Sequence, residues 1–566
     1  MAKTFATAAL SGLVLGMALL ATRTSWSADN SNQGLQATPE EMQWWRDAKF
    51  GMFIHWGPVS LKGTEIGWSR GGERRGRKDK STGAIPVEVY DNLYKQFNPT
   101  QFDAKEWVGI ARAAGMKYLV FTSKHHDGFC EFDSKLTTYT IMSSPFHRDV
   151  VGEIAKACHD AGLKVGWYYS PPDWHHPDYR TENHARYIEY LHGQLRELCT
   201  NYGKIDIIWF DGLGGKPQDW DTTPLITMIR RLQPGVIINN RAGLPADHDT
   251  PEQRIGKSQT NRAWESCITI CRQWAWKPND EMKSFKQCIQ TLVQVVGGDG
   301  NLLFNVGPMP TGEIEPRQVE RLKEMGEWLA KCGESIYGTR GGPFEPATWG
   351  ASTFKGNTIY LHILDWKLEG DVVTLPPIKK KIVSSSILAG GVANVKQSDE
   401  GIEVSVPPAD RQEIDTIVVL QLDGPAAEAR PAAVNRSNSV AAGKPAKASN
   451  VYRQQTEHEA SRAFDGDDGT RWATDAGIKQ AWLEVDLGQP ATFDRALLME
   501  EYDRVQKFEL QYKEGEEWRT FARGETIGDS LMLKFSPVTA RNVRLNILDA
   551  TEGPTIREFQ LLAPRK

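Results

Sequence analysis

Short runs of β-branched and aromatic residues alternate with longer helical patterns from about residue 40 to residue 340. The predicted strands are KFGMFIHWG (49–57), KYLVFTSKHHDG (117–128), LKVGWYYSPPDW (163–174), IDIIWFDG (205–212), VIINNR (236–241), AWESCITI (263–270) and GNLLFNVGP (300–308). Helical patterns lie between them, for example at 103–114, 150–161, 182–202 and 317–331. This alternation is typical of βα units around a parallel sheet. Seven strands predict a (β/α)₈-like barrel over 38–340, with one strand degenerate or missing.

The rest of the chain has short alternating runs with no helical period between them. Residues 341–424, which include NTIYLHIL and TIVVLQL, predict an antiparallel β-sandwich domain. Residues 425–448 are rich in Ala, Pro and Ser and cannot bury a core, so they predict a linker. The short strands of 449–566, such as AWLEVDLG and KFELQYK, predict a further β-sandwich.

The first 27 residues predict a signal peptide. A basic start precedes an apolar run over 8–21, and Ser25 and Ser27 are small residues at the two positions that determine cleavage. We therefore expect export to the periplasm or the extracellular space, with a mature chain that begins near Ala28. No later run approaches the roughly 20 apolar residues of a membrane span, so no transmembrane segment is predicted.

The composition argues against a polyanion as the main partner. Lys and Arg total 67 against 72 Asp and Glu, a net charge of -5, so no bulk positive field exists for a nucleic acid or an anionic membrane. The 19 tryptophans are many for 566 residues, and an indole offers a flat apolar face that suits sugars. The seven cysteines leave at least one unpaired, and only Cys267 and Cys271 are near neighbours, which favours buried thiols over a metal site.

Asp211 is the strongest single candidate for catalysis. It ends the predicted strand over 205–212, beside Trp209, and catalysis in such barrels takes place at the carboxyl ends of the strands. An N-cap for the next helix is the alternative. Because Gly212, Gly214 and Gly215 delay that helix, we expect a catalytic carboxylate instead.

Three histidines end neighbouring strands. His55 ends the first, and His125 and His126 end the second. They can bind a metal, donate hydrogen bonds to the hydroxyl groups of a ligand, or belong to the core. Because adjacent residues of a strand point to opposite faces, His125 and His126 cannot both bind one ion without a break in the strand, and we favour hydroxyl recognition. His175 and His176, after the third strand, predict a solvated loop.

Glu252 and Glu265 are the next acidic candidates. Cleavage of a glycosidic bond with retention requires two carboxyl groups about 5 to 5.5 Å apart, one to attack the anomeric carbon and one to protonate the leaving oxygen. Asp211 can form that pair with either of them. We expect Glu252 on a loop after the fifth strand, where it can reach over the barrel mouth, and Glu265 within a strand. An ordinary surface or salt-bridged acid is the alternative for each.

Aromatic and basic residues surround these candidates. Six side chains fall at or after strand ends, as a sugar pocket requires: Tyr168, Tyr169, Trp209, Arg241, Trp274 and Trp276. The segment 69–80 has six basic and two acidic residues, a net charge of +4. A solvated flexible loop is the expectation for this segment, and a rim for an acidic ligand is the alternative.

Five motifs, taken in order, resemble those of the α-L-fucosidases of glycoside hydrolase family 29 over roughly residues 38–425. They are FGMFIHWG, the strand ending in KHHDG, GWYYSPPDW, WFDG and GGDGNLLFNVGPMPTGEI. The resemblance implies a retaining exo-α-L-fucosidase that removes terminal α-linked L-fucose from glycans. It also implies an imperfect (β/α) barrel followed by a β-sandwich, with no cofactor or metal for catalysis.

The resemblance implies roles for individual residues as well. Asp211 matches the family nucleophile, and Glu252 follows it at the interval at which related bacterial enzymes place the acid/base; Glu265 is the second choice. The positions that match fucose-binding residues are His55, Trp68, His125, His126, Tyr168, Trp209, Arg241 and Trp276. The family often has Glu directly before this Trp. Here Gly67 occupies that position and Glu65 lies two residues earlier, so the sequence departs from the family at this contact with the sugar.

A second resemblance covers the carboxyl-terminal region. AFDGDDGTRW (463–472), WLEVDLG and IREFQLL resemble the discoidin or coagulation factor 5/8 C-type domain, which includes carbohydrate-binding module family 32. It implies carbohydrate binding and a structural calcium with Asp465, Thr470 and Glu558 as ligands, since calcium takes oxygen ligands. A plain Asx-rich turn is the alternative.

Two other function classes stay open on the sequence alone. A carbohydrate-binding or adhesion protein with a non-catalytic barrel is compatible with the discoidin-like module, although the two carboxylate candidates argue against it. A retaining glycosidase for another sugar, such as an α-galactoside or an arabinoside, differs from a fucosidase only in contacts to single hydroxyl groups.

Overall fold

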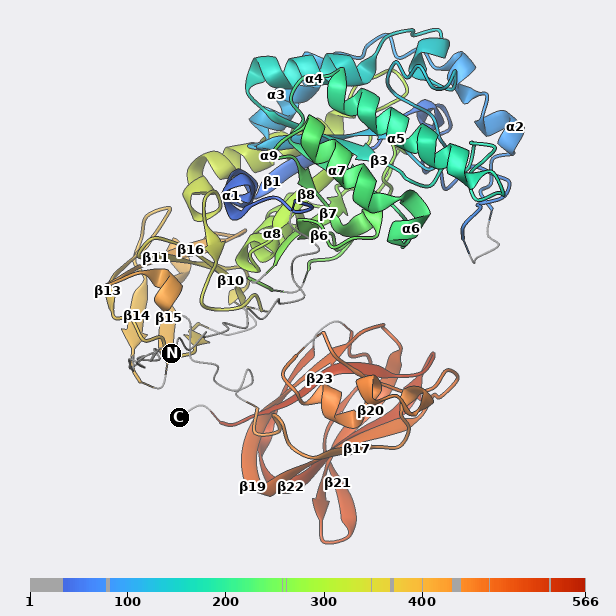
Figure 1. The fold of residues 1–566 in the computed structure, drawn as a ribbon. Helices are drawn as coiled ribbons and strands as arrows, with labels where there is room; N and C mark the ends of the chain where they lie inside the picture. The colour runs from blue at the N-terminus through green and yellow to red at the C-terminus, as the bar shows by residue number, and fades with distance from the viewer. Residues whose placement is uncertain are drawn as a thin grey trace, which may run out of the picture. The chain divides into compact units, whose positions relative to one another are not determined.

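The computed structural model describes residues 34–77, 82–256, 258–260, 262–347, 349–366, 371–399, 401–429, 439–467, 469–528 and 531–564. The predicted signal peptide at 1–27 lies outside these residues. Among the described helices, none has the length and apolar character that a membrane span requires. Figure 1 shows a barrel domain and two β domains.

Eight parallel strands form the barrel. They are β1 (Phe50–Ile54), β2 (Tyr118–Lys124), β3 (Lys164–Tyr169), β4 (Ile207–Phe210), β5 (Ile237–Ile238), β6 (His248–Asp249), β7 (Ala263–Thr269) and β8 (Asn301–Val306). The hydrogen-bonded order is β5-β4-β3-β2-β1-β8-β7-β6, and a parallel bridge between Asn239 and His248 joins the two ends. The predicted barrel is confirmed, and the strand that the sequence left degenerate or missing is β6. Glu252 therefore follows the sixth strand, whereas the sequence placed it after the fifth.

The barrel strands are buried on both faces, which explains why they read as nearly continuous apolar runs. Every residue of β1, β2, β4, β7 and β8 is buried. Gly51 is required by a close approach, because a Cβ atom at this position would lie 2.3 Å from the ring of Tyr118 on the neighbouring strand. The interior of the barrel is thus a packed core that leaves space for a ligand only at its ends.

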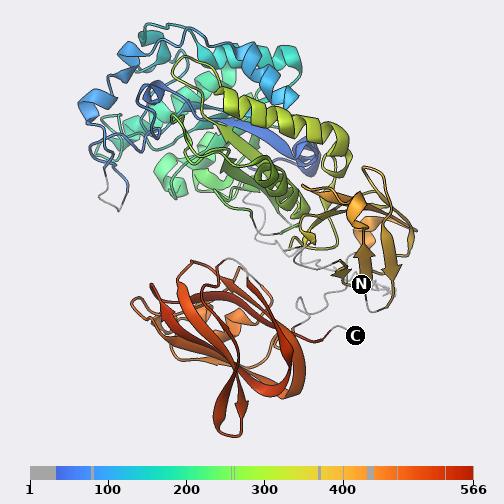
Figure 2. The same cartoon turned by 180° about the vertical axis from the view of Figure 1, so that it is seen from behind.

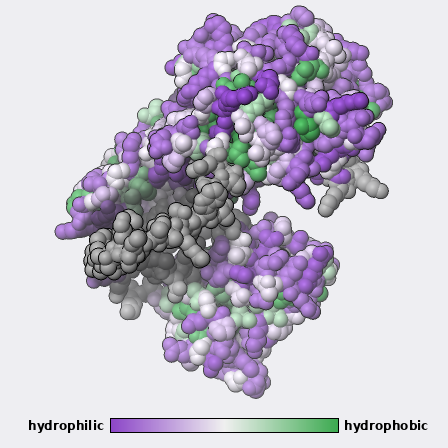
Figure 3. Space-filling view, in the orientation of Figure 1, coloured by the Kyte–Doolittle hydropathy of each residue, from purple (hydrophilic) through white to green (hydrophobic). Residues whose placement is uncertain are grey.

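Helices cover the outside of the barrel (Figure 1). They are α1 (Pro39–Ala48), α2 (Val87–Tyr90), α3 (Ala104–Ala113), α4 (Val150–Ala161), α5 (His184–Thr200), α6 (Pro217–Trp220), α7 (Thr222–Leu232), α8 (Phe285–Gly297) and α9 (Pro316–Cys332). Their starts follow from side-chain caps: Asp103 accepts from the N–H of Lys105 before α3, and Asp149 from that of Gly152 before α4. Figure 2 shows α9, in yellow-green, running across the strands on the reverse side. The visible outer surface is mostly hydrophilic (Figure 3), as expected of amphipathic helices.

The second part of the chain is an antiparallel β-sandwich. Its larger sheet has the order β13-β16-β11-β10-β9 and its smaller sheet the order β12-β15-β14. The strands are β9 (Arg340–Gly341), β10 (Gly350–Lys355), β11 (Thr358–Ile363), β12 (Val373–Leu375), β13 (Ile382–Ile387), β14 (Asn394–Gln397), β15 (Ile402–Ser405) and β16 (Thr416–Leu422). Leu361, Leu375, Val404 and Leu420 from both sheets belong to one buried core, which holds the sandwich together.

The predicted linker at 425–448 is structured at both of its ends. Ala426 and Ala429 are buried in the core of the β-sandwich. Ala441 is buried in the core of the last domain, and β17 (Ala446–Ala448) pairs with a strand of that domain. Alanine side chains of this stretch are thus buried in both cores, which its composition did not reveal. Residues 430–438 lie outside the described part of the chain.

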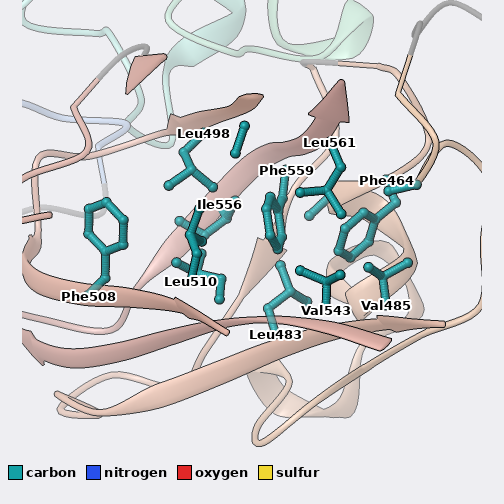
Figure 4. Close-up of a cluster of buried hydrophobic side chains, with 14 of the residues drawn as sticks. Phe464, Leu483, Val485, Leu498, Phe508, Leu510, Val543, Ile556, Phe559 and Leu561 are labelled. Atoms are coloured by element: carbon teal, nitrogen blue, oxygen red, sulfur yellow. The ribbon is translucent and has the colours of Figure 1, made fainter. Parts of the chain in front are cut away.

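The last domain is an antiparallel sheet domain with a discoidin-like fold. Its strands are β17, β18 (Trp472–Ala473), β19 (Ala481–Glu500), β20 (Val505–Glu514), β21 (Glu517–Gly524), β22 (Leu531–Ala550) and β23 (Thr555–Leu562). The long strands β19 and β22 pair with each other and shift register after Asp486 and after Phe493. The residues labelled in Figure 4, among them Phe464, Leu498 and Phe559, form the apolar core of this domain.

Candidate active site

The candidate residues gather at the carboxyl ends of the barrel strands. His55 follows β1, His125 and His126 follow β2, and Tyr168 is the penultimate residue of β3. On the following strands, Asp211 follows β4, Arg241 follows β5, and Glu252 follows β6. Because parallel strands end at the same rim, residues far apart in the sequence meet there. Contacts between their side chains define a site centred on Asp211.

The carboxylate of Asp211 is held on three sides. The hydroxyl of Tyr168 donates a hydrogen bond to Oδ2 over 3.0 Å, and Nε2 of His126 lies 3.4 Å from the same oxygen. Nη1 of Arg241 donates to Oδ1 over 3.2 Å. The side chain keeps an exposed fraction of 14%, so the carboxylate is fixed in place and still accessible from the barrel mouth.

These neighbours set the charge of Asp211. Burial alone would raise its pKa, but the contact with His126 and the positive charge of Arg241 outweigh burial and hold the pKa well below the ordinary carboxyl range. Burial and the nearby Asp211 charge raise the pKa of Tyr168, so its hydroxyl keeps its proton and remains a donor. Asp211 is therefore ionised near neutral pH.

Glu252 is connected to Asp211 through Arg241. Nη1 of Arg241 donates to Oε2 of Glu252 over 2.7 Å, and the same nitrogen donates to Oδ1 of Asp211 over 3.2 Å. The two carboxylate oxygens are therefore no more than about 5.9 Å apart. Thr250 fixes the guanidinium from behind, because its Oγ1 accepts from Nε and its carbonyl from Nη2 of Arg241. The side chain of Glu252 has an exposed fraction of 43%, so it faces the opening.

Glu265 lies inside the barrel. It belongs to β7 and has an exposed fraction of 1%. Oε2 accepts a hydrogen bond from the hydroxyl of Tyr118 over 2.5 Å, and Oε1 accepts one from Nε1 of Trp209 over 3.1 Å. Both oxygens thus serve the packing of the barrel interior, and Glu265 has little access to an exchanging ligand.

The histidines form a wall beside Asp211. The ring of His125 stacks on Tyr168 with centroids 5.3 Å apart, and the ring of His126 lies 4.2 Å from that of His125. Adjacent histidines within a strand would point to opposite faces, but β2 ends at Lys124, so the break in the strand that the sequence set as the condition for their approach is present here. Burial lowers the pKa of His55 to about 4, although the contact with Asn305 acts in the opposite direction and raises it. This imidazole is therefore neutral near neutral pH.

Three of these groups are close enough to bind one metal ion. Potential ligand atoms of His125, His126 and Asp211 all lie within 4.8 Å of one another. The fit to a divalent cation is poor, because Arg241 already supplies a positive charge at 3.2 Å from Asp211. Nδ1 of His126 is also engaged at 2.6 Å by the hydroxyl of Ser170.

Indole rings enclose the site. Trp209 stacks on Tyr168 with centroids 5.6 Å apart, and the Arg241 guanidinium lies 4.7 Å from its ring. The ring of Trp68 lies 5.6 Å from that of His126. Trp276, which the sequence singled out, lies beside Gly63, where an added Cβ atom would come within 3.7 Å of its ring.

Sequence reasoning missed several residues that position this site. Asn305, in β8, contacts Nδ1 of His55 at 2.7 Å and donates to the carbonyl of Trp274 over 2.7 Å. The ring of Trp274 then packs 4.8 Å from His55. Glu65 accepts from the N–H groups of Trp274 and Ala275 over 2.9 and 3.4 Å. An asparagine at the end of an apolar strand was the signal for Asn305. Glu65 was noted only for its place near Trp68, and its backbone partners could not be inferred from the sequence.

Carboxylates at the end of a parallel barrel, within a wall of histidine, tyrosine and tryptophan, define a glycoside hydrolase site. The family model for α-L-fucosidase matches residues 18–334, and the model for the F5/8 type C domain matches residues 445–559. The chain belongs to the α-L-fucosidases of glycoside hydrolase family 29 and has a discoidin-type domain at its carboxyl end.

Known proteins agree with this assignment. Tissue alpha-L-fucosidase from Macaca fascicularis is 30% identical over 398 residues, which cover 64% of this chain and 84% of that protein. The solved alpha-L-fucosidase isoenzyme 1 from Paenibacillus thiaminolyticus is 37% identical and has a TM-score of 0.61. The match covers 68% of this chain and 99% of that chain. A fucosidase from Bacteroides thetaiotaomicron, solved as a trapped covalent intermediate with 2-fluoro-fucosyl fluoride, is 29% identical with a TM-score of 0.62, over 69% of this chain and 97% of that one.

The fold similarity extends over almost the whole chain in one case. The alpha-L-fucosidase from Vibrio sp. strain EJY3 has a TM-score of 0.66 over 94% of this chain and 99% of that chain. Its identity of 21% supports a similarity of fold alone.

Proposed function

We propose that this α-L-fucosidase is an exported, retaining exo-enzyme that removes terminal α-linked L-fucose from glycans. The observation that carries the proposal is the pair Asp211 and Glu252, whose oxygens lie within about 5.9 Å of each other around one nitrogen of Arg241. A separation of about 5 to 5.5 Å is typical of retaining glycosidases, whereas inverting enzymes need room for a water molecule.

In the proposed first step, Asp211 attacks the anomeric carbon while Glu252 protonates the leaving oxygen. The bond to the aglycone breaks and an ester forms between the sugar and Asp211. His126 and Arg241 keep Asp211 ionised before the attack, and Tyr168 donates a hydrogen bond to it. The low pKa of Asp211 also makes it a good leaving group in the second step.

In the second step, Glu252 takes a proton from a water molecule that attacks the ester. Esterification removes the negative charge of Asp211, so Arg241 is then paired with the carboxylate of Glu252 alone. The carboxylate is the form that a general base needs. Glu265 is disfavoured for the role because it is buried and both of its oxygens are engaged.

The neutral imidazole of His55 and the rings of His125 and His126 are proposed to bind the sugar hydroxyls. Trp68 and Trp209 are proposed to contact the faces and the methyl group of the sugar, since indoles suit such surfaces. Trp276 is proposed as a more distant wall of the pocket. Catalysis is proposed to need no metal or other cofactor, because Arg241 supplies the positive charge beside Asp211.

The discoidin-type domain is proposed to bind glycans and to hold a structural calcium ion. Oδ2 of Asp465 and Oγ1 of Thr470 lie 2.8 Å apart, and Glu558 of β23 is buried. These are the oxygen ligands that calcium prefers. Arg462, whose Nη1 lies 3.6 Å from Asp465, is the cation that the ion would displace. Tethering to glycan would raise the effective concentration of substrate.

The test is hydrolysis of 4-nitrophenyl α-L-fucoside and 4-nitrophenyl α-galactoside by the mature protein and by the Asp211→Asn variant. We expect rapid release from the fucoside, loss of release in the variant, and the α-anomer of fucose as the first product by proton NMR. Glycan binding without release would support a binding or adhesion protein, and preferential release from the galactoside would support another sugar. Cleavage after Ser27 in the exported protein, read by mass spectrometry, tests the signal peptide.

A further inference from the structure

The basic segment after Trp68 is fixed to two loops of the barrel. Arg74 donates a hydrogen bond to the carbonyl of Trp68. Arg75 donates to the carbonyls of His176 and Pro177, after β3, over 2.6 and 2.8 Å. The sequence predicted a flexible solvated loop here. In its described part, the segment is instead anchored beside the candidate active site.

Two guanidinium groups of the segment stack on indole rings. Cζ of Arg74 lies 5.2 Å from the ring of Trp68 and 5.5 Å from that of Trp174, and Cζ of Arg77 lies 4.9 Å from Trp68. Stacking uses the face of a guanidinium and leaves its N–H donors in the plane of the group. Residues 73–77 contain three arginines and one acid, Glu73, so the segment is locally positive although the whole chain has a charge of -5.

The arginines lie on one particular side of the site. Trp68, on which Arg74 and Arg77 stack, contacts His126, and His126 faces Oδ2 of Asp211. Glu252 is on the other side, where Arg241 joins it to Oδ1. The segment follows β1 and packs on residues that follow β2 and β3, and each of these strands is three or four positions from β6 in the eight-stranded barrel. The segment and Glu252 therefore lie on opposite sides of the mouth.

This placement separates the sugar from the leaving group. The proton donor must contact the leaving oxygen, so the aglycone departs on the side of Glu252. The arginines therefore face substituents of the terminal sugar itself. Fucose has no carboxylate, and an oxyanion on it must be an ester of a hydroxyl group. Guanidinium groups match the geometry of such oxyanions and form strong charge-assisted hydrogen bonds with them.

We propose that Arg74, Arg75 and Arg77 form a subsite for an oxyanion on the terminal sugar, with a sulfate half-ester on a fucose hydroxyl as its ligand. The proposal rests on the proposed fucosidase function and specifies its substrate class: glycans that end in sulfated fucose.

The experiment compares kcat/KM for 4-nitrophenyl α-L-fucoside, for its 2-, 3- and 4-O-sulfates, and for an aryl fucoside with a sulfonate on the aryl ring. The readout is the ratio of each charged substrate to the neutral one, so a general loss of activity cancels. We expect efficient hydrolysis of at least one fucose sulfate. Its ratio should fall about tenfold or more for each arginine removed in Arg75→Gln/Arg77→Gln, as expected for charge-assisted hydrogen bonds.

A matched control is Arg112→Gln/Arg196→Gln, which removes the same charge from exposed positions on α3 and α5. Its ratio should stay that of the native enzyme. The proposal is contradicted if the native enzyme hydrolyses the neutral fucoside but no sulfate. It is equally contradicted if both double variants behave alike, or if only the sulfonate on the aryl ring is favoured.

A native enzyme that hydrolyses none of the fucosides would contradict the proposed function itself. The subsite is then tested by calorimetry with fucose 2-, 3- and 4-sulfate as the probes. Binding that weakens in Arg75→Gln/Arg77→Gln but not in Arg112→Gln/Arg196→Gln supports the subsite, and absence of binding to the native protein contradicts it.

Discussion

Asp211 and Glu252 accept hydrogen bonds from the same nitrogen atom, Nη1 of Arg241. When one carboxylate loses its charge, the positive charge of the arginine is therefore paired with the other carboxylate alone. Glu252 is coupled in this way to the charge of Asp211, which is lost when the ester forms, and it can therefore act as acid in the first step and as base in the second.

Tyr168 is predicted to support the ionised nucleophile. Tyr168→Phe removes the hydrogen bond to Oδ2 of Asp211, and loss of a hydrogen bond to a charged group should lower kcat about 10- to 100-fold. The neighbouring Tyr169→Phe is a matched control, because that hydroxyl donates to Gln194 and not to Asp211. Equal losses in the two variants would show that packing, not the contact with Asp211, matters.

The two acid/base candidates are predicted to differ in their response to azide. In Glu252→Ala, azide should accept the fucosyl group from the enzyme and give fucosyl azide with the original α configuration, since the nucleophile is intact. Glu265→Gln should instead lower the melting temperature, because it alters the contacts with Tyr118 and Trp209. Azide rescue in a Glu265→Ala variant, but not in Glu252→Ala, would exchange the two roles.

Glu65 is predicted to make stability depend on pH. Burial raises its pKa to about 7, against the hydrogen bonds from Trp274 and Ala275. The folded protein thus holds this proton more tightly than the unfolded chain does. The stabilisation is complete below the ordinary carboxyl pKa and is lost as the pH rises through about 7.

Between about pH 5 and pH 8, the free energy of unfolding of Glu65→Gln should therefore fall by about 1–3 kcal/mol less than that of the native protein. Chemical denaturation at both pH values measures this difference. Glu88→Gln, at an exposed position on α2, is the control and should keep the native pH dependence. An unchanged pH dependence in Glu65→Gln would refute the assignment.

Calcium removal is predicted to act on the discoidin-type domain alone. The reference is the native protein at a calcium concentration about 100 times the Kd. Relative to it, chelation or Asp465→Ala should destabilise this domain by about 3 kcal/mol. Hydrolysis of the soluble aryl fucoside should not change, because Arg241 and not a metal supplies the charge beside Asp211. Inactivation by a chelator would instead favour an ion at His125, His126 and Asp211.

The sequence predicted the barrel because most of its strands are fully buried and their apolar runs are long. It missed β6, because this strand has only two residues, His248 and Asp249, and two residues are too few to show an alternation of apolar and polar side chains. The consequence for the site was small: Glu252 lies at the rim in either case. The ends of the linker were misread because alanines that fill a core look the same in composition as alanines in a loop.

The positions of the candidate residues at strand ends could be inferred, but their contacts could not. The closeness of His125 and His126 depends on where β2 ends, which a pattern of apolar residues locates only to within a few positions. The contacts of Glu65 and Asn305 join parts of the chain that are more than 200 residues apart in the sequence. Only the folded chain reveals such pairs.

The most direct test of the central claim is to trap the intermediate. The mature protein is incubated with 2-fluoro-fucosyl fluoride, and its intact mass and peptides are measured. We predict one fluorofucosyl group per molecule, attached to Asp211, and none on the Asp211→Asn variant. A fucosidase that is active but forms no adduct, or one whose adduct maps to another carboxylate, would contradict the account.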